Sequence, residues 1–173
     1  LGQVDYANAI NDYVKQVKEI TGSSQVDLFG LSHGGQCIAS YLYYYGDNGD
    51  VRKACMSAPA IGGTSMAGDP MTGQPVNLDY AKIIEFAEIG YSSEDEWEWL
   101  IKFIGYEHLN EVVTLLCQKY IVDYIKYYCS IWDFVPLAVF EDAIAYTGIN
   151  EQDNGDLYLK TRQYHEEAMT HMS

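Results

Sequence analysis

The sequence is poor in basic residues and has no low-complexity tract, and each shortage argues against a class of protein. Lysine and arginine together number 10 against 25 aspartates and glutamates, which gives a net charge of −15. Such a surface repels phosphate backbones and anionic lipid headgroups, so nucleic-acid binding is disfavoured. Hydrophobic residues make up 48% of the 173 residues. This composition is that of a folded globular domain and excludes an intrinsically disordered segment.

The sequence also lacks paired cysteines and long apolar runs. Its four cysteines, Cys37, Cys55, Cys117 and Cys129, lie in apolar stretches without a C-x-x-C pair. The ligand spacing of zinc sites and of thioredoxin-like redox sites is therefore missing, and we expect neither a metal nor an organic cofactor. We expect buried free thiols, with a single disulfide as the alternative. Charged residues interrupt the longest apolar region, residues 112–140, so no membrane span is expected.

The first 60 residues alternate between helix and strand patterns. Apolar residues recur at helical spacing in two segments, and a glycine follows each of them. Two short β-favouring runs lie after these helices. This order is that of an α/β sheet, and it sets the predicted fold class as α/β. The expected elements are helices over residues 3–21 and 33–45, ended by Gly22 and Gly46, and strands over residues 25–29 and 51–57.

The rest of the chain changes character after a turn-rich segment at residues 60–75, which is a boundary candidate. Only helical patterns follow it, and Ser93 with Glu96 forms a capping box at the start of one helix. We therefore divide the chain into an α/β part, residues 1–76, and an all-helical part, residues 77–173. The expected helices of the second part span residues 77–90, 93–104, 107–128, 137–146 and 157–169.

The tetrapeptide Asp-Asn-Gly-Asp occurs twice, at residues 47–50 and 153–156. Each copy lies between expected elements, and neither continues into the pattern of a calcium-binding EF-hand loop. We therefore predict a turn at both places.

One motif in the sequence has the pattern of a catalytic serine. Gly30-Leu31-Ser32-His33-Gly34 matches the pattern G-x-S-x-G where an expected strand ends and an expected helix begins. At so tight a turn the central residue is strained, and side chains two positions away would collide with their neighbours. We expect Gly30 and Gly34 to remove these collisions. Ser32 Oγ then projects beyond the sheet edge, and the N–H of His33 at the positive end of the helix faces an oxyanion.

The segment Val-Asp-Leu-Phe-Gly-Leu-Ser-His-Gly-Gly-Gln at residues 26–36 resembles the nucleophile elbow of the α/β-hydrolase superfamily. It is most similar to the lipase and lecithin–cholesterol-acyltransferase-like branch, and residues 51–63 resemble the next strand and exit of that branch. The resemblance covers residues 3–63 in detail. It implies a partial α/β-hydrolase core followed by a helical lid over an apolar acyl site. It also implies a serine esterase or lipase, with Ser32 as the nucleophile and the His33 N–H as one oxyanion donor.

The same resemblance implies groups that we expect outside this chain. In the family a second oxyanion donor comes from an earlier loop, and the acid and the base follow later strands in the order Ser, Asp or Glu, His. His33 is an unsuitable base because adjacent residues on an elbow diverge. Since the chain opens at Leu1 without an initiator methionine or signal core, we expect processing or truncation there, and the compartment stays undetermined. The other in-chain candidates for acid and base are Asp133, Asp153, Asp156, His108, His165 and His171.

Several alternatives stay open. Acyl transfer to an alcohol would use the same residues as hydrolysis of a small-molecule or lipid ester, and a non-catalytic interaction module could keep the fold without the chemistry. Trp97, Trp99 and Trp132 either line an acyl channel or pack in the core of the helical part. Two strands leave edges and an apolar face uncovered. We therefore predict that the chain, made alone, forms homo-oligomers, aggregates, or pairs with complementary segments.

Overall fold

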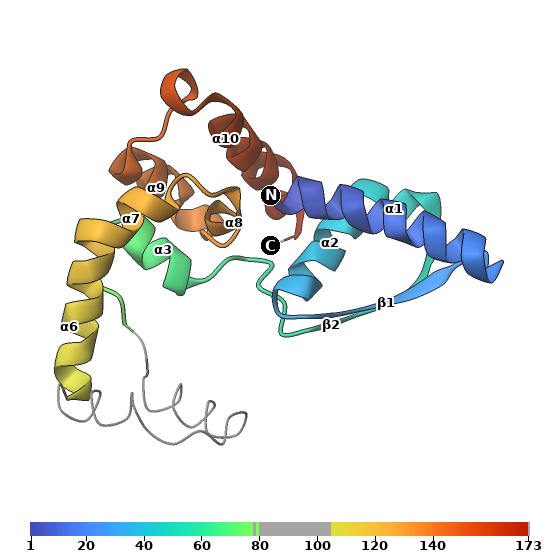
Figure 1. Cartoon of the computed structure of the whole chain (residues 1–173), viewed down its shortest axis with the longest axis horizontal. Coiled ribbons are helices and arrows are strands. Elements are labelled where there is room, and N and C mark those ends of the chain that lie inside the picture. The colour runs from blue at the N-terminus through green and yellow to red at the C-terminus, as the bar shows by residue number, and fades with distance from the viewer. Residues whose placement is uncertain (78, 80–104, 173) are drawn as a thin grey trace.

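The computed structural model describes residues 1–77, 79 and 105–172 (Figure 1). These residues form a mixed α/β fold that is mostly helical and contains a small parallel sheet of two strands. The predicted α/β class is thereby confirmed. The expected helix over residues 77–90 and the helix capped by Ser93 and Glu96, with Trp97 and Trp99, lie outside the described residues.

The first 57 residues form the predicted order of helix, strand, helix and strand. Gly22 ends α1 in the left-handed conformation with φ 69°, where a side chain would be strained. Gly46 also follows its helix, as predicted, but it keeps a right-handed conformation and begins a 3₁₀ turn, so that the left-handed stop falls three residues later at Gly49. The elements are α1 (Gln3–Thr21), β1 (Val26–Leu31), α2 (His33–Tyr45) and β2 (Val51–Ser57).

The two strands run parallel, and one face of their sheet is covered by α1 and α2 (Figure 1). Ala7 and Val14 of α1 and Tyr41 of α2 are buried there against apolar residues of both strands. On the opposite face the side chains of Phe29 and Leu31 are 73% and 64% exposed. The sheet is therefore covered on one side and open on the other within the described residues, as the count of two strands predicted.

The helical part has a separate core, centred on the fully buried Trp132. Met71, Val135 and Phe140 pack around it, so Trp132 takes the core position that was one of its two expected roles. The elements of this part are α3 (Ser65–Met71), α6 (Tyr106–Leu116), a π-helical turn (Cys117–Ile121), α7 (Val122–Ile125), α8 (Cys129–Trp132), a 3₁₀ turn (Leu137–Val139), α9 (Phe140–Thr147), α10 (Glu151–Gln163), a second π-helical turn (Tyr164–Met169) and α11 (Thr170–Met172).

The helix α3 lies in the segment that was predicted to be turn-rich. It begins at the side chain of Thr64, which accepts a hydrogen bond from the N–H of Met66, the usual way in which a threonine caps a helix. Its Met71 belongs to the core around Trp132. The division of the chain at residue 76 stays a prediction, but by packing α3 belongs to the helical part.

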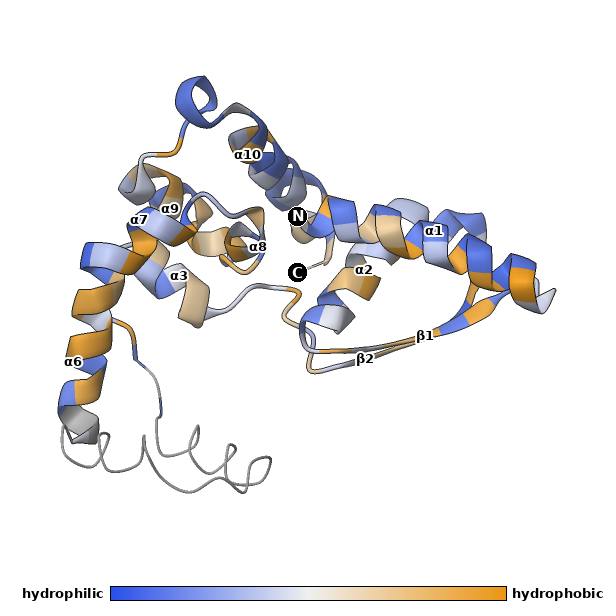
Figure 2. Ribbon diagram, viewed as in Figure 1, coloured by the Kyte–Doolittle hydropathy of each residue, from blue (hydrophilic) through white to orange (hydrophobic). Residues whose placement is uncertain are grey.

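The two Asp-Asn-Gly-Asp copies adopt different structures. The first forms the 3₁₀ turn before Gly49, as predicted. The prediction was wrong for the second, which lies inside α10 (Figure 2, at the hydrophilic start of that helix). Asn150 caps α10 by accepting a hydrogen bond of 2.9 Å from the N–H of Asp153, so the helix starts before the tetrapeptide. The helix kinks at Gly155, whose φ is 14° and ψ −96°.

The four cysteines are free thiols in the structure, but only Cys37 is buried, whereas Cys55 is exposed on β2. The expectation of buried thiols is therefore wrong for Cys55, because the side of the sheet on which it lies has no covering layer among the described residues. None of the helices in the described ranges combines the length and the hydropathy that a bilayer span requires.

Candidate active site

Ser32 lies between the last residue of β1 and the first residue of α2 and has a strained backbone. Its φ is 52° and its ψ −120°, a region that residues with a side chain rarely occupy. Three backbone hydrogen bonds hold it there. Its N–H donates to Ser57 O at 2.9 Å, and its carbonyl accepts from the N–H groups of Gly35 at 2.9 Å and Gln36 at 3.3 Å. The surrounding turn and sheet therefore impose the conformation of Ser32.

The two glycines of the motif have different roles. A Cβ on Gly30 would lie 2.5 Å from the carbonyl oxygen of Gly34 and 2.7 Å from the nitrogen of Gly35, which is closer than real contacts allow. A Cβ on Gly34 would have nothing within 4 Å. The expectation that Gly34 removes a collision is therefore wrong, since its Cα faces open space at the start of α2. Gly35 takes that role instead, because its Cβ would lie 2.9 Å from Cβ of Pro59.

A second strained residue lies beside Ser32. Ala58 follows the last residue of β2 and has a φ of 45°. Each of the two parallel strands is thus followed directly by a residue that has a side chain and a positive φ. These residues lie at the edge of the sheet where α/β proteins bind ligands. The sequence carried no signal for Ala58, because a residue that precedes a proline is expected to be extended.

His33 is the first residue of α2, so its N–H lies in the turn whose N–H groups have no acceptor within the helix. Its ring is packed against other segments. Nε2 is 2.9 Å from Nε2 of Gln3, and the ring centroid lies 5.2 Å from that of Tyr6 and 5.0 Å from that of Phe134. Burial lowers the pKa of His33. The side chain is therefore engaged in packing, while the backbone N–H at the start of α2 can donate to a ligand.

The in-chain histidines lie in other surroundings. His165 is fully buried, with Nδ1 2.8 Å from Thr161 O and Nε2 3.0 Å from Val135 O. Both ring nitrogens thus face backbone carbonyls of the helical part. His108 and His171 are exposed, and the nearest polar partners of their rings are Glu111 and the carbonyl of Glu167.

Ser32 Oγ has no hydrogen-bond partner among the described residues. None of the candidate acids or histidines of the chain is joined to it there by a hydrogen bond, although Ser32 itself is exposed. Asp153 instead lies in the first turn of α10, where its carboxylate accepts a hydrogen bond of 2.9 Å from Nδ2 of Asn150.

Asp133 is the one candidate acid with an unusual environment. It is 2% exposed, and burial raises its pKa to about 7, although the backbone N–H of Gln3 opposes this shift. One of its carboxyl oxygens has no hydrogen-bond partner among the described groups. Its carbonyl accepts a hydrogen bond of 2.7 Å from the side chain of Gln36, which also contacts the hydroxyl of Tyr164. Asp133 therefore lies in the joint between α2 and the helical part.

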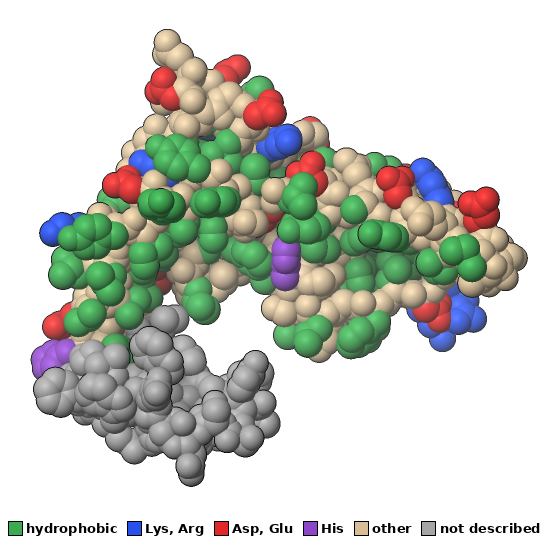
Figure 3. Space-filling view, viewed as in Figure 1, with side chains coloured by type: hydrophobic (Ala, Val, Ile, Leu, Met, Phe, Trp, Pro, Cys, Tyr) green, Lys and Arg blue, Asp and Glu red, His purple; other side chains and the backbone are tan. Residues whose placement is uncertain are grey.

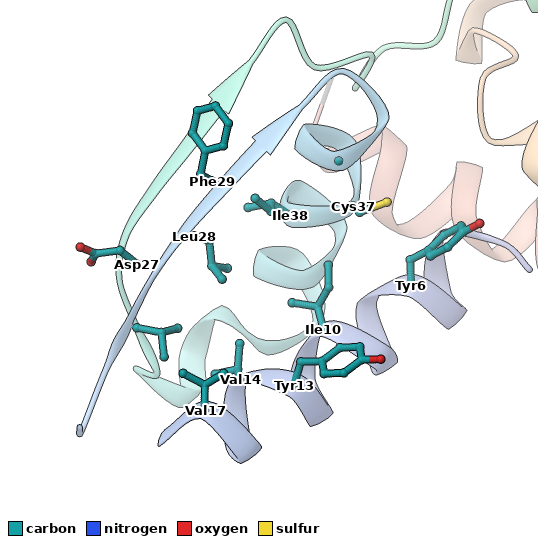
Figure 4. A pocket seen from close by; sticks show the side chains of 12 residues that line it. Tyr6, Ile10, Tyr13, Val14, Val17, Asp27, Leu28, Phe29, Cys37 and Ile38 are labelled. Atoms are coloured by element: carbon teal, nitrogen blue, oxygen red, sulfur yellow. The ribbon is translucent and has the colours of Figure 1, made fainter. Parts of the chain in front are cut away.

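An apolar groove of about 450 Å³ runs beside β1 and reaches Gly34 next to the elbow. Ile10 and Val14 of α1, Leu28 of β1 and Ile38 of α2 point toward one another in it (Figure 4). Asp27 points away, and its carboxylate pairs with Arg52 on β2, which lowers the pKa of Asp27. The groove therefore offers a mainly apolar surface beside the turn.

Comparison with models of protein families, with curated proteins and with solved structures finds no match to this chain. Within the described residues, His, Cys, Asp and Glu side chains form no group of three or more that could hold a metal ion. The geometry around Ser32 is therefore the basis on which a function can be argued.

Proposed function

We propose that this chain carries the nucleophile of a serine hydrolase of the α/β-hydrolase type, which cleaves carboxylic esters through an acyl-enzyme on Ser32. The observation that carries the proposal is the conformation of Ser32, which is exposed and held at φ 52° between a parallel strand and a helix. A strained serine at this turn is the geometry of a nucleophile elbow. Strain of this kind persists where the surrounding structure imposes it, and it clusters at active sites.

The proposed reaction follows from the groups at the turn. Ser32 Oγ attacks the ester carbonyl, and the carbonyl oxygen becomes an oxyanion. The N–H of His33 then donates a hydrogen bond to it, and the positive end of α2, a helix of 13 residues, adds to this stabilisation. A histidine oriented by a carboxylate takes the proton of Oγ and delivers it to the leaving alcohol.

The exposed apolar residues of the helical part support an apolar acyl substrate. Hydrophobic side chains gather along α6 and its continuation (Figures 2 and 3). Four of the exposed ones recur there at intervals of four residues. The exposed fractions are 41% for Val112, 44% for Leu116, 57% for Tyr120 and 75% for Tyr124. Such a surface suits the acyl chain of a lipid ester. Transfer of the acyl group to an alcohol instead of water would use the same nucleophile.

Labelling with a fluorophosphonate, which reacts with activated serine hydroxyls, tests the proposal. We expect intact-mass analysis to show one adduct on the full-length protein, in which the acid and the base of the site are supplied, and none on its variant Ser32→Ala. The matched control is Ser57→Ala, which removes an exposed hydroxyl at the end of the neighbouring strand and should keep the adduct. An adduct that survives Ser32→Ala excludes Ser32 as the nucleophile. A folded protein that never reacts favours the alternative of a non-catalytic interaction module.

A further inference from the structure

The side chain of His33 is held by a chain of contacts that begins in α1. Gln3, the first residue of that helix, is 1% exposed. Its Oε1 accepts a hydrogen bond of 3.1 Å from the hydroxyl of Ser40, and its Nε2 lies 2.9 Å from Nε2 of His33. One buried side chain thus links α1 to the middle and to the start of α2.

These contacts determine the protonation state and the tautomer of the His33 ring. The single proton of the Ser40 hydroxyl has two acceptors at 3.1 Å, Oε1 of Gln3 and the carbonyl of Gln36. With that proton on Oε1, the group of Gln3 that points at His33 is the amide NH₂, which can only donate. Nε2 of His33 must therefore accept, so the ring is neutral and carries its proton on Nδ1. Burial raises the pKa of the Cys37 thiol, and a hydrogen bond from the same Gln3 opposes this rise. This opposition is consistent with an amide that donates.

Two aromatic rings complete the surroundings of His33. Tyr6 of α1 meets the imidazole edge-on with an interplanar angle of 90°, and Phe134 of the helical part lies on it at 54°. The titratable groups near this cluster include Tyr6 on α1, Cys37 on α2 and Asp133 beside Phe134, and the N-terminal amine and Asp5 act on Asp133 in turn. A cationic ring would lose the hydrogen bond from Gln3 and would place a charge among these apolar contacts.

We propose that Gln3 is a positioning residue of the active site. By holding the imidazole of His33 neutral and in one orientation, it fixes the first residue of α2 and thereby the N–H that faces the oxyanion at Ser32. The inference rests on the proposed hydrolase function for its catalytic consequence. Its structural part, the tautomer of His33, stands by itself. An oxyanion donor that is free to shift by a fraction of an ångström stabilises the transition state less.

The first test needs no activity. Long-range ¹H–¹⁵N spectra of protein labelled in its histidines report the tautomer of each ring, and the signals of His33 are assigned by their loss in His33→Asn. We expect a neutral ring with the proton on Nδ1 at pH 7. A cationic ring, or a proton on Nε2, overturns the inference even if Ser32 proves to be the nucleophile.

The second test measures the hydrolysis of a short p-nitrophenyl ester by the full-length protein, in which the acid and the base of the site are supplied. Gln3→Met keeps the length of the side chain and removes the hydrogen bond, and we expect kcat to fall about tenfold with little change in KM. Gln3→Glu offers a carboxylate to His33, and we expect it to make the ring cationic and to move the pH profile of kcat. The control Gln25→Met changes an exposed glutamine whose side chain donates a hydrogen bond to Gly49 O.

The two tests separate the outcomes. Equal kcat values and equal pH profiles for the wild type and both Gln3 variants, with unchanged circular dichroism, overturn the positioning role. Wild-type protein without labelling or esterase activity overturns the proposed function instead, and the tautomer of His33 then decides the structural part alone. A kcat that falls only in proportion to the folded fraction indicates a structural role for Gln3 and also overturns the inference.

Discussion

The elbow unit, residues 1–57, and the helical part, residues 64–76 and 105–172, depend on different kinds of interaction. In the elbow unit Gly30, Ser32 and Gly35 form one turn, and Ser57 O and Pro59 add contacts from the neighbouring strand and its exit. In the helical part the core around Trp132 joins segments that are far apart, from Met71 to Ile149. The comparison teaches that the turn at Ser32 is built from residues close in sequence and completed by the neighbouring strand, whereas the core of the helical part depends on packing between distant segments.

The two regions meet at a small set of polar and aromatic contacts. The side chain of Gln36 in α2 reaches the carbonyl of Asp133 and the hydroxyl of Tyr164, and Phe134 lies against the ring of His33. Burial raises the pKa of Tyr164 to about 12, which keeps its hydroxyl protonated. The joint therefore places the helical part directly against the start of α2.

The largest expected effect on stability comes from a substitution in the core around Trp132, and it tests whether the two regions unfold independently. Trp132→Ala removes a fully buried side chain whose Nε1 donates to Lys126 O at 2.8 Å, and we expect it to lower the free energy of unfolding by about 3–5 kcal/mol. If the elbow unit has its own core, hydrogen exchange will speed up in α8 and α9 while the amides of β1 and α2 keep their protection. Equal loss of protection in both regions would show that they unfold as one unit.

A smaller effect on stability depends on pH and comes from Asp133, in the joint between α2 and the helical part. Asp133 has a pKa of about 7 when folded, against an ordinary value of 3.8. Between these values the folded state holds a proton that the unfolded state has lost, so the stability falls as the pH rises from 4 to 7 and is level above. The full difference corresponds to at most about 4 kcal/mol.

Urea unfolding at pH 4 and pH 8 measures this slope. We expect Asp133→Asn to remove most of it, because an amide cannot ionise and still accepts a hydrogen bond from the N–H of Gln3. The exposed Asp142→Asn serves as the control of equal charge change. A slope of unchanged size in Asp133→Asn would mean that Asp133 is ionised at its ordinary pKa and that the joint does not penalise its charge.

The smallest expected effects on stability come from the two glycines of the motif, Gly30 and Gly34. Gly30→Ala places a Cβ against the backbone of Gly34 and Gly35, and we expect a loss of about 1–3 kcal/mol together with loss of labelling at Ser32. Gly34→Ala is the matched variant in the same motif. Its Cβ meets open space near the start of α2, so we expect unchanged labelling and a gain of up to about 1 kcal/mol. Similar losses in both variants would contradict the different roles of the two glycines.

The order of elements in the elbow unit and the place of Ser32 could be predicted from the sequence. Helical spacing, β-favouring runs and Gly22 gave α1, β1, α2 and β2 to within two residues of their ends. The different roles of Gly34 and Gly35 could not be predicted, because they depend on where Pro59 returns after β2. The second Asp-Asn-Gly-Asp copy was misjudged because the cap at Asn150 outweighs the turn preference of the tetrapeptide.

By itself, the sequence determined the α/β class, the strand-to-helix turn and the identity of its central serine, because glycine tolerance and hydrophobic periodicity act over a few residues. The tertiary structure alone decided that the ring of His33 is held by Gln3, Tyr6 and Phe134 and that Asp133 is buried beside α1. These arrangements join residues that lie about 30 to 130 positions apart. Only the packing of the folded chain brings such residues into contact, since no local pattern specifies which distant segment will cover a given face.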